Sequence, residues 1–318
     1  MQAPPDSIQD ARCGLVVYTE LSMPSDDKKP AAFAGRLTER SYWDTVHQGS
    51  PESAPSPDRN RPKRSAGLRR LVPPLLLHWL RDSFAQEDFW NRLLPRYVAR
   101  DPGGKVLEIG VAPGHEVLRF QARFGHEPFG IEFSPAGAET TRRNFAAHGI
   151  RVSNVIEGDV FDRALLAQYE SKFDVVFSRG FIEHFADPTE VIANHVHLAK
   201  PGGLIVISIP RLTGFHYLLT RVLMPHQIAV HNLSIMWLEP FRQLFDPAGM
   251  EPLFCGYQGG PNFLVSYTDN PSGLRAVMQW WTFKMQGLAN LAGWASDGRL
   301  MRGAYFEASL LFIGRKRI

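Results

Sequence analysis

The chain is 318 residues long, a length that suits one α/β domain with additions rather than two full domains. Apolar residues make up 44% and charged residues 21%, and these fractions exclude a mostly disordered or fibrous chain. Lys and Arg total 35 against 32 Asp and Glu, so the net charge is +3. Such a balance argues against a dedicated nucleic-acid binder, which concentrates positive charge.

Cysteine content and the first residues predict a reduced, cytoplasmic protein. Cys13 lies in an expected tail and Cys255 in the expected core, so neither a disulfide framework nor a structural zinc site is expected. The N-terminus lacks the positive region and the apolar stretch of a signal peptide. No run reaches the ~18 consecutive apolar residues that a membrane helix needs. We therefore expect no membrane span.

The first hundred residues predict a tail followed by a helical lid or linker. Residues 1–38 contain prolines and lack periodicity, which predicts a disordered tail, and residues 39–100 are assigned to the lid or linker. Within it, the stretch 59–70 is basic without an acidic residue, and we interpret it as a solvated linker or an anion-binding segment. Apolar residues recur at helical spacing over 75–98, and Pro95 would kink or end that helix.

From residue 101 the chain alternates between strand and helix patterns. Strands are predicted over 105–109, 129–133, 152–156, 173–177 and 204–209, and helices over 116–124, 137–148, 164–170 and 188–199. Five strands at this spacing, several of them apolar on both faces, predict a doubly wound parallel sheet.

The alternation stops after Pro210. We assign 211–250 to a helical lid insertion rich in His and aromatic residues, and 270–300 to a second helical insertion before the last strand. The helix predicted over 274–294 carries Trp280 and Trp281, which favours a core position or a dimer face over a membrane surface. Two late strands are predicted over 252–257 and 304–314.

The loop after the first strand predicts a ligand site, because ligands of parallel sheets bind beyond the carboxyl ends of the strands. Gly110 and Gly114 allow the backbone to approach a ligand closely. A dinucleotide loop would also need glycine where Ala112 and His115 stand, so that motif fails. Glu108, two residues before Gly110, suits a cationic ligand better than a pyrophosphate.

Two acidic residues follow the next strands in order. Glu132 ends the second strand, where a carboxylate can accept hydrogen bonds from both ribose hydroxyls. Asp159 follows the third strand and can accept from an adenine amine, while a backbone N–H near Val160 can donate to a ring nitrogen. The loop and the two acids together predict an adenosyl site.

These residues resemble the class I S-adenosylmethionine-dependent methyltransferases. The resemblance rests on Leu107-Glu108-Ile109-Gly110 with Gly114, Glu132, Asp159 and Lys200-Pro201-Gly202-Gly203, and it covers about residues 100–210. It implies a Rossmann-like sheet of seven strands, mostly parallel, with the last strand antiparallel in an edge hairpin within a methyltransferase domain over 101–318. It also implies S-adenosyl-L-methionine as cofactor and S-adenosyl-L-homocysteine as product.

The resemblance assigns the cofactor contacts residue by residue. Gly110, Ala112 and Gly114 would contact the methionine part of the cofactor. Glu132 would bind the ribose, and Asp159 with Val160 would bind the adenine. Glu108 and Ser178, two strand residues, are added to the site. The chain departs from the family at Ala112, where glycine is frequent.

The loop after the fourth strand, residues 178–185, faces the methyl group in that family. His184 has the intrinsic pKa of a general base, or it packs structurally against the cofactor loop. Arg179 binds an acceptor carboxylate or phosphate, or it pairs with Glu183. We predict these three residues to be catalytic. The loop lacks the Asn/Asp-Pro-Pro-aromatic stretch typical of amino-base methyltransferases, which argues against that acceptor class.

The expected lids supply candidate acceptor contacts. These are Tyr42, Trp43, His216, Tyr217, His226 and His231. Tyr42 and Trp43 could instead anchor the tail, and His231 could be a buried structural residue. His226 and His231 could form a metal pair, but no Cys or carboxylate lies at ligand spacing from them in the sequence, so no metal is expected.

The sequence therefore predicts a methyltransferase acting on a small molecule, with a hydroxyl or carboxylate oxygen as the acceptor atom. A small thiol is the alternative acceptor. Two other classes stay open, namely a nicotinamide-dependent oxidoreductase and a non-catalytic cofactor-binding module. The expected partner is a small-molecule substrate, without nucleic acid, and a homodimer is a candidate assembly.

Overall fold

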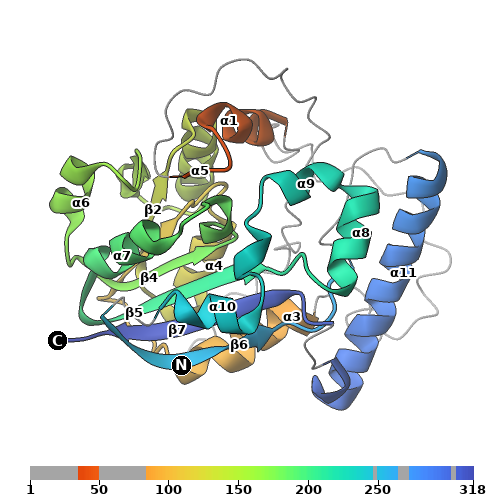
Figure 1. The fold of residues 1–318 in the computed structure, drawn as a ribbon. Helices are drawn as coiled ribbons and strands as arrows, with labels where there is room; N and C mark the ends of the chain where they lie inside the picture. Colours follow the sequence, from red (N-terminus) through yellow and green to blue (C-terminus); the bar gives the residue numbers. More distant parts are fainter. Residues whose placement is uncertain (1–34, 50–83, 246–248, 264–271, 302–305) are drawn as a thin grey trace.

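The computed structural model describes residues 35–49, 84–245, 249–263, 272–301 and 306–318 (Figure 1). Most of the predicted tail and the basic stretch 59–70 lie outside the described residues. Of the helices in these ranges, none combines the length and the hydropathy that crossing a bilayer requires.

A seven-stranded sheet forms the centre of the molecule, in the order β3-β2-β1-β4-β5-β7-β6. The first five strands are parallel, while β7 is antiparallel to both β5 and β6. The strands are β1 (Lys105–Ile109), β2 (Glu127–Glu132), β3 (Val155–Glu157), β4 (Phe173–Arg179), β5 (Ala199–Pro210), β6 (Met250–Gln258) and β7 (Ser309–Lys316). The predicted fold class is confirmed.

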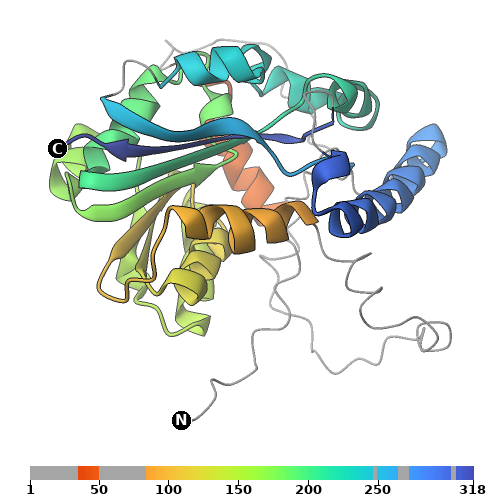
Figure 2. The same ribbon diagram turned by 90° about the horizontal axis from the view of Figure 1, so that it is seen from below.

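Helices cover both faces of the sheet, as Figure 2 shows. Side chains of α4, α5 and the segment α3–η3 pack on one face, and those of α6, α7 and α10 on the other. The helical elements are α1 (Arg40–Gly49), α3 (Phe84–Glu87), the π-helical η2 (Asp88–Leu93), the 3₁₀ turn η3 (Leu94–Arg96), α4 (His115–Phe124), α5 (Pro135–Ala147), α6 (Arg163–Tyr169), α7 (Thr189–Leu198), α8 (Phe215–Leu223), α9 (Pro225–Ala229), the 3₁₀ turn η6 (Leu233–Ile235), α10 (Leu238–Gln243) and α11 (Gly273–Ser296).

The ends of several elements differ from the prediction for local reasons. Helix α5 begins two residues early, because the Ser134 hydroxyl accepts from the Gly137 N–H and Pro135 fits the first helical turn. Strand β3 is short, because residues 152–154 form a 3₁₀ turn in which the Asn154 amide donates to the Pro128 carbonyl at 3.0 Å. Strand β5 begins at Ala199, five residues before the predicted start, so residues 200–203 belong to the strand.

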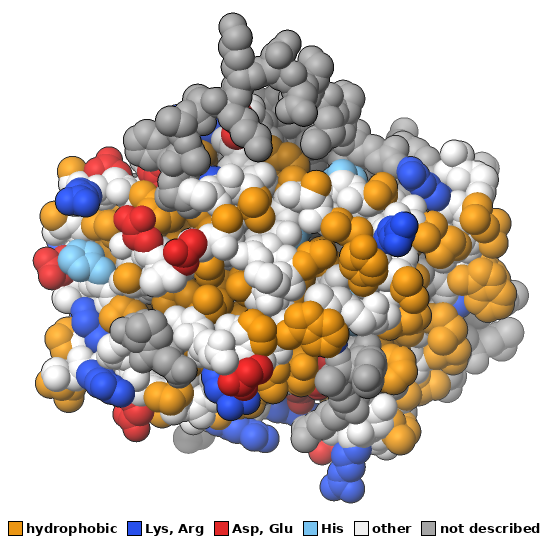
Figure 3. All heavy atoms as spheres, in the orientation of Figure 1, with side chains coloured by type: hydrophobic (Ala, Val, Ile, Leu, Met, Phe, Trp, Pro, Cys, Tyr) orange, Lys and Arg blue, Asp and Glu red, His pale blue; other side chains and the backbone are white. Residues whose placement is uncertain are grey.

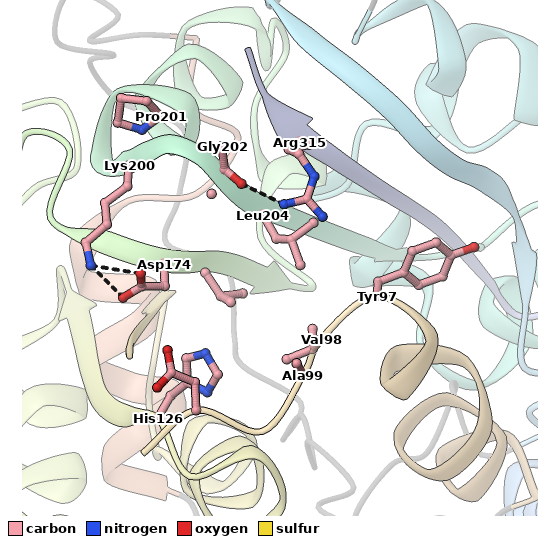
Figure 4. A pocket seen from close by; sticks show the side chains of 13 residues that line it. Tyr97, Val98, Ala99, His126, Asp174, Lys200, Pro201, Gly202, Leu204 and Arg315 are labelled. Atoms are coloured by element: carbon pink, nitrogen blue, oxygen red, sulfur yellow. Dashed lines mark hydrogen bonds and ion pairs between the residues drawn. The ribbon is translucent and has the colours of Figure 1, made fainter. Parts of the chain in front are cut away.

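The predicted turn at 200–203 lines a hollow beneath the amino ends of β1 and β4 (Figure 4). Lys200 Nζ lies 2.8 Å from both carboxylate oxygens of Asp174, and Arg315 donates to the Gly202 carbonyl at 2.8 Å. These pairs join β4, β5 and β7 at the end of the sheet opposite to the predicted ligand loops. We therefore interpret this hollow as structural.

Helix α11 presents an apolar face to solvent. Its buried side chains include Gln279, Thr282, Gln286 and Asn290, whereas its exposed large side chains are Leu274, Val277, Trp280, Trp281, Phe283, Met285 and Leu288. Figure 3 shows hydrophobic side chains gathered over this helix, at the right of the view. The prediction that Trp280 and Trp281 lie in the core is wrong, because the helix packs on α3 and α8 through its polar face. The dimer face stays a prediction.

Two tryptophans in different environments give a matched test of this packing. Trp90 is 1% exposed and Trp281 is 56% exposed. We expect Trp90→Ala to lower the free energy of unfolding by roughly 3–5 kcal/mol, because it empties a packed site. Trp281→Ala should change it by less than about 0.5 kcal/mol in dilute protein. Denaturant unfolding of both variants measures the difference, and equal losses would contradict the placement of α11.

Candidate functional site

A cavity lies at the carboxyl ends of the four parallel strands β1, β2, β3 and β4. Residues at or after the ends of these strands line it, together with side chains of α1 and of the residues that precede it. Helix α1 packs against α5 (Figure 1). The lining comprises Arg36, Thr38, Trp43, Val46, His47, Ile109, Gly110, Ala112, Ile131, Glu132, Phe133, Gly158, Asp159, Val160, Arg179, Gly180, Phe181, His184 and Phe185. Loops far apart in the sequence therefore meet here, as the sequence predicts for a parallel sheet.

The glycine loop forms one wall of the cavity. Gly110 has a φ of +73° and Gly114 a φ of +97°, a region that L side chains rarely adopt. A Cβ atom on Gly110 would lie 2.7 Å from the Phe181 ring, so glycine is required there for space as well as for conformation. The backbone is thus open toward the cavity, which fits the close approach of a ligand.

Glu132 connects this loop to the second strand. Its Oε2 accepts from the Ala112 N–H at 3.1 Å, and its Oε1 accepts from the Ser134 N–H at 2.8 Å. Burial raises the pKa of Glu132 to about 7, against the lowering effect of these backbone N–H groups. Glu132 lines the cavity, and its contact with a ribose stays a prediction.

Asp159 and Val160 line the same cavity. Asp159 Oδ1 accepts from the Phe161 N–H at 3.0 Å and forms an ion pair with Arg36. The Val160 carbonyl accepts from the Asn194 side chain at 3.0 Å, which fixes the loop on α7. The structure therefore brings the glycine loop, Glu132 and Asp159 to one cavity.

Three of the assigned cofactor contacts, namely Glu108, Gly114 and Ser178, are not among the residues that line the cavity. Glu108 Oε2 accepts from the Val117 N–H at 3.0 Å, and this carboxyl group therefore supports the first turn of α4 beneath the cavity. Its pKa lies well above the ordinary value because of burial and of the nearby Glu116. The Ser178 hydroxyl is buried against α7, 2.9 Å from Nε2 of His195. Both side chains point away because strand residues alternate between faces.

Arg36 is a site residue that the sequence predicts to lie in the disordered tail. It lies 4.4 Å above the Phe133 ring and 5.0 Å from the Phe161 ring, in addition to its ion pair with Asp159. A β-bridge joins Arg36 to Phe185, so residues 35–38 pack onto the fourth-strand loop. A single arginine in an aperiodic segment carries no sequence signal of this role.

Helix α1 forms the roof of the cavity. Trp43 packs edge-on against His184 at 4.9 Å and stacks with His47 at 6.2 Å, and both Trp43 and His47 line the cavity. Its indole N–H donates to the Thr38 hydroxyl at 3.1 Å. Tyr42 is directed to the lid insertion instead, where it hydrogen-bonds Gln227.

His184 reaches the cavity from the fourth-strand loop. Its Nδ1–H donates to the Val230 carbonyl at 2.9 Å, which leaves the lone pair on Nε2. Nε2 has no hydrogen-bond partner among the described residues. Burial and the nearby His231 hold the pKa of His184 well below its ordinary value, so the imidazole is neutral and carries an acceptor nitrogen without a partner.

Glu183 is fully buried beside His184. In the described part of the chain, neither of its carboxyl oxygens has a hydrogen-bond partner. Burial raises its pKa to about 8, so the carboxyl group keeps its proton at neutral pH. The alternative pairing of Arg179 with Glu183 is wrong. Arg179 Nη1 lies 2.6 Å from Glu116 and its guanidinium 4.6 Å from the Phe89 ring.

Glu183, His184 and His231 place one ligand atom each within 4.8 Å of one another. The backbone N–H of Asn232 donates to the Glu183 carbonyl at 2.7 Å, which holds the lid insertion against the fourth-strand loop. The sequence shows no carboxylate near His231, because Glu183 is distant from it in the chain. Such a cluster can hold a divalent cation or share a proton.

The other lid residues lie apart from this cluster. His226 belongs to α9, and its Nε2 contacts the Gln227 side chain at 3.3 Å. Burial, with a smaller effect of His226, lowers the pKa of His231 to about 4. His216 is buried on α8, where its Nε2 accepts from the Asn262 N–H at 3.4 Å. Tyr217 is half-buried on the same helix.

Several known proteins are similar to this chain in sequence. A family model described as a methyltransferase domain matches residues 77–253, more than half of the chain. The ubiquinone biosynthesis O-methyltransferase of Proteus mirabilis is 32% identical over 106 residues, 33% of this chain and 42% of that protein. The 27-O-demethylrifamycin SV methyltransferase of Amycolatopsis mediterranei is 24% identical over 182 residues, 55% and 65% of the two chains. The chain thus spans less than two thirds of these relatives.

Among solved structures, geranyl diphosphate C-methyltransferase from Streptomyces coelicolor is similar with a TM-score of 0.49 and 12% identity. That match covers 73% of this chain and 80% of the other.

The glycine loop gives a first prediction for this site. Gly110→Ala should abolish most binding of S-adenosylhomocysteine, because the new Cβ would displace the Phe181 ring. Gly149→Ala is the matched control, since Gly149 has a φ of +72° and a Cβ added to it would meet no atom within 4 Å. Both variants should lose roughly 1–2 kcal/mol of stability from backbone strain. Calorimetric titration measures the binding. Equal affinities of the two variants for S-adenosylhomocysteine would refute the role of the glycine loop in cofactor binding.

Glu183 gives a pH prediction. Its raised pKa means that the folded state keeps a proton that the unfolded state loses, so stability falls as pH rises from about 4.5 to 8. Glu183→Gln should flatten this slope, whereas Glu190→Gln on the exposed face of α7 should leave it unchanged. Thermal unfolding between pH 5 and pH 8.5 would measure the slopes, and identical slopes for Glu183→Gln and the unmodified protein would exclude a buried neutral carboxyl group.

Proposed function

The chain belongs to the methyltransferase-domain family, and we propose that it transfers a methyl group to an oxygen atom of a small-molecule acceptor. The observation that carries the choice of oxygen is His184, a residue of the cavity lining whose neutral imidazole has a buried Nε2 without a hydrogen-bond partner in the described chain. A hydroxyl acceptor must lose its proton, and a neutral imidazole can receive it.

The cavity residues fit S-adenosylmethionine, the cofactor of this enzyme class. Gly110 and Ala112 would hold the methionine part, Glu132 the ribose, and Asp159 with Val160 the adenine. Gly114 would shape this loop where it turns into α4. When bound, the sulfonium supplies an electrophilic methyl group. The chain itself positions the reactants beneath α1, whose Trp43 and His47 help to exclude water from the cavity.

His184 acts as the general base in this proposal. Nε2 accepts the proton of the acceptor hydroxyl, while Nδ1–H keeps its bond to the Val230 carbonyl and thereby the ring orientation. The resulting imidazolium lies within 4.8 Å of the Glu183 carboxyl group. Glu183 would then release its own proton to solvent, and the carboxylate left behind would offset the new charge.

Two observations favour oxygen over the alternatives. Relatives matched by the chain carry O-methyltransferase names. A thiol ionises more readily and needs no strong base, so a thiol enzyme would not require the His184 arrangement.

A nicotinamide-dependent oxidoreductase would need a glycine where Ala112 stands. We also expect a cytoplasmic location and no nucleic-acid partner.

Replacement of the base separates the oxygen and thiol proposals. With a phenolic or alcoholic acceptor identified by release of S-adenosylhomocysteine, His184→Gln should lower turnover by about 10²-fold or more. Binding of S-adenosylhomocysteine by calorimetry should stay unchanged. His197→Gln, a half-exposed control on α7, should keep full turnover. A thiol acceptor turned over normally by His184→Gln would overturn the oxygen assignment.

A further inference from the structure

A buried arginine at the carboxyl end of β5 has hydrogen-bond donors without a partner among the described residues. Arg211 is the first residue after β5, and its backbone N–H donates to the Ala308 carbonyl at 2.7 Å. Its side chain is 0% exposed, and its guanidinium lies 5.2 Å from the Trp237 ring and 5.0 Å from the Tyr257 ring. The position is therefore a closed, aromatic-walled site around a permanent cation.

The hydrogen-bond donors of Arg211 are only partly used. Nη1 donates to the Glu307 carbonyl at 3.1 Å, whereas Nε and Nη2 have no partner among the described residues. These two N–H groups point along the same edge of the guanidinium plane. That edge is the fork to which a carboxylate or phosphate binds through two oxygens.

His216 adds a third donor near Arg211. Its Nε2 accepts from the Asn262 N–H, so the proton of the neutral ring resides on Nδ1, and this buried Nδ1 also has no partner in the described ranges. Burial and the charge of Arg211 lower the pKa of His216 to about 4. The imidazole therefore stays neutral and offers an N–H.

A buried cation with unused donors is unfavourable unless an anion compensates it. Glu307 lies near enough to raise the pKa of Arg211, against the lowering effect of burial. Its contact with the guanidinium is through the backbone carbonyl, and no carboxylate of the described residues forms an ion pair with Arg211. Three unused donors around one positive charge thus lack an oxyanion.

The location of this site connects it to the reaction. Ser208 of β5 pairs with Arg179 of β4, and the Ser208 carbonyl accepts from the Gly180 N–H at 2.8 Å. Arg179 and Gly180 line the cofactor cavity. Arg211 follows three residues later along the chain, so it lies at the same carboxyl edge of the sheet, on the side of the lid insertion.

We propose that Arg211 and His216 bind an oxyanion, a carboxylate or phosphate group, of the methyl acceptor. The assignment to an acceptor rests on the proposed function, whereas the anion site itself does not. The acceptor is then an anionic small molecule whose charged group docks at the end of β5 while its hydroxyl reaches His184. This narrows the substrate class from small molecules in general to acids and phosphate esters.

Isothermal titration calorimetry at constant ionic strength tests the site without turnover. The probes are benzoate, phenyl phosphate and benzamide, which is the neutral analogue of benzoate in shape. The unmodified protein should bind benzoate or phenyl phosphate at least 10-fold more tightly than benzamide, and the stronger of the two identifies the preferred oxyanion. The proposal would be overturned if the protein binds S-adenosylhomocysteine but binds benzamide as tightly as it binds benzoate and phenyl phosphate.

Variants locate the binding. Arg211→Met should lose at least 10-fold in affinity for the anionic probe, with benzamide binding unchanged, because the fork and the charge are removed together. Arg211→Lys keeps the charge without the fork and should lose less, and His216→Phe should weaken binding severalfold. Unchanged anion binding by a folded Arg211→Met protein would refute the site. Titration with S-adenosylhomocysteine runs in parallel. Its failure alone would refute the methyltransferase assignment and leave the anion site standing.

Discussion

One carboxyl group holds the cofactor site together. Glu132 accepts backbone hydrogen bonds from Ala112 in the first loop and from Ser134 at the start of α5. These bonds fix the glycine turn relative to the second strand, so the cavity wall is set before any ligand arrives. Because we propose the same carboxyl group as the ribose contact, one side chain would both shape the cavity wall and bind the cofactor.

Burial controls the chemistry at the fourth-strand loop. Removal from water raises the pKa of Glu183 and lowers that of His184, so both groups are neutral near neutral pH. A neutral pair can exchange a single proton without leaving a lone charge in the interior. The charge at Arg211 cannot be removed in this way, because a guanidinium keeps its proton, and in our proposal the oxyanion of the acceptor balances it.

Local sequence patterns predicted most of the secondary structure. They could not predict contacts between residues that are far apart in the chain. The strands followed from apolar runs, and Glu132 and Asp159 followed from their positions at strand ends. The partner of Arg179 could not be read in the same way, because Glu116 comes from α4 and only the folded loop brings it near. Arg36 was lost for the opposite reason, since an isolated contact across more than a hundred residues leaves no periodic trace.

The roof of the cavity comes from residues upstream of the stretch recognised as the family domain. Arg36, Trp43 and His47 all precede residue 77, where the family match begins. A shortened protein that begins at residue 77 would keep every strand and the glycine turn, but it would lack these lining residues. The adenosyl part of a bound cofactor would then be exposed to solvent. The start of the family match and the start of the complete cavity therefore lie at different residues, because the match begins after α1.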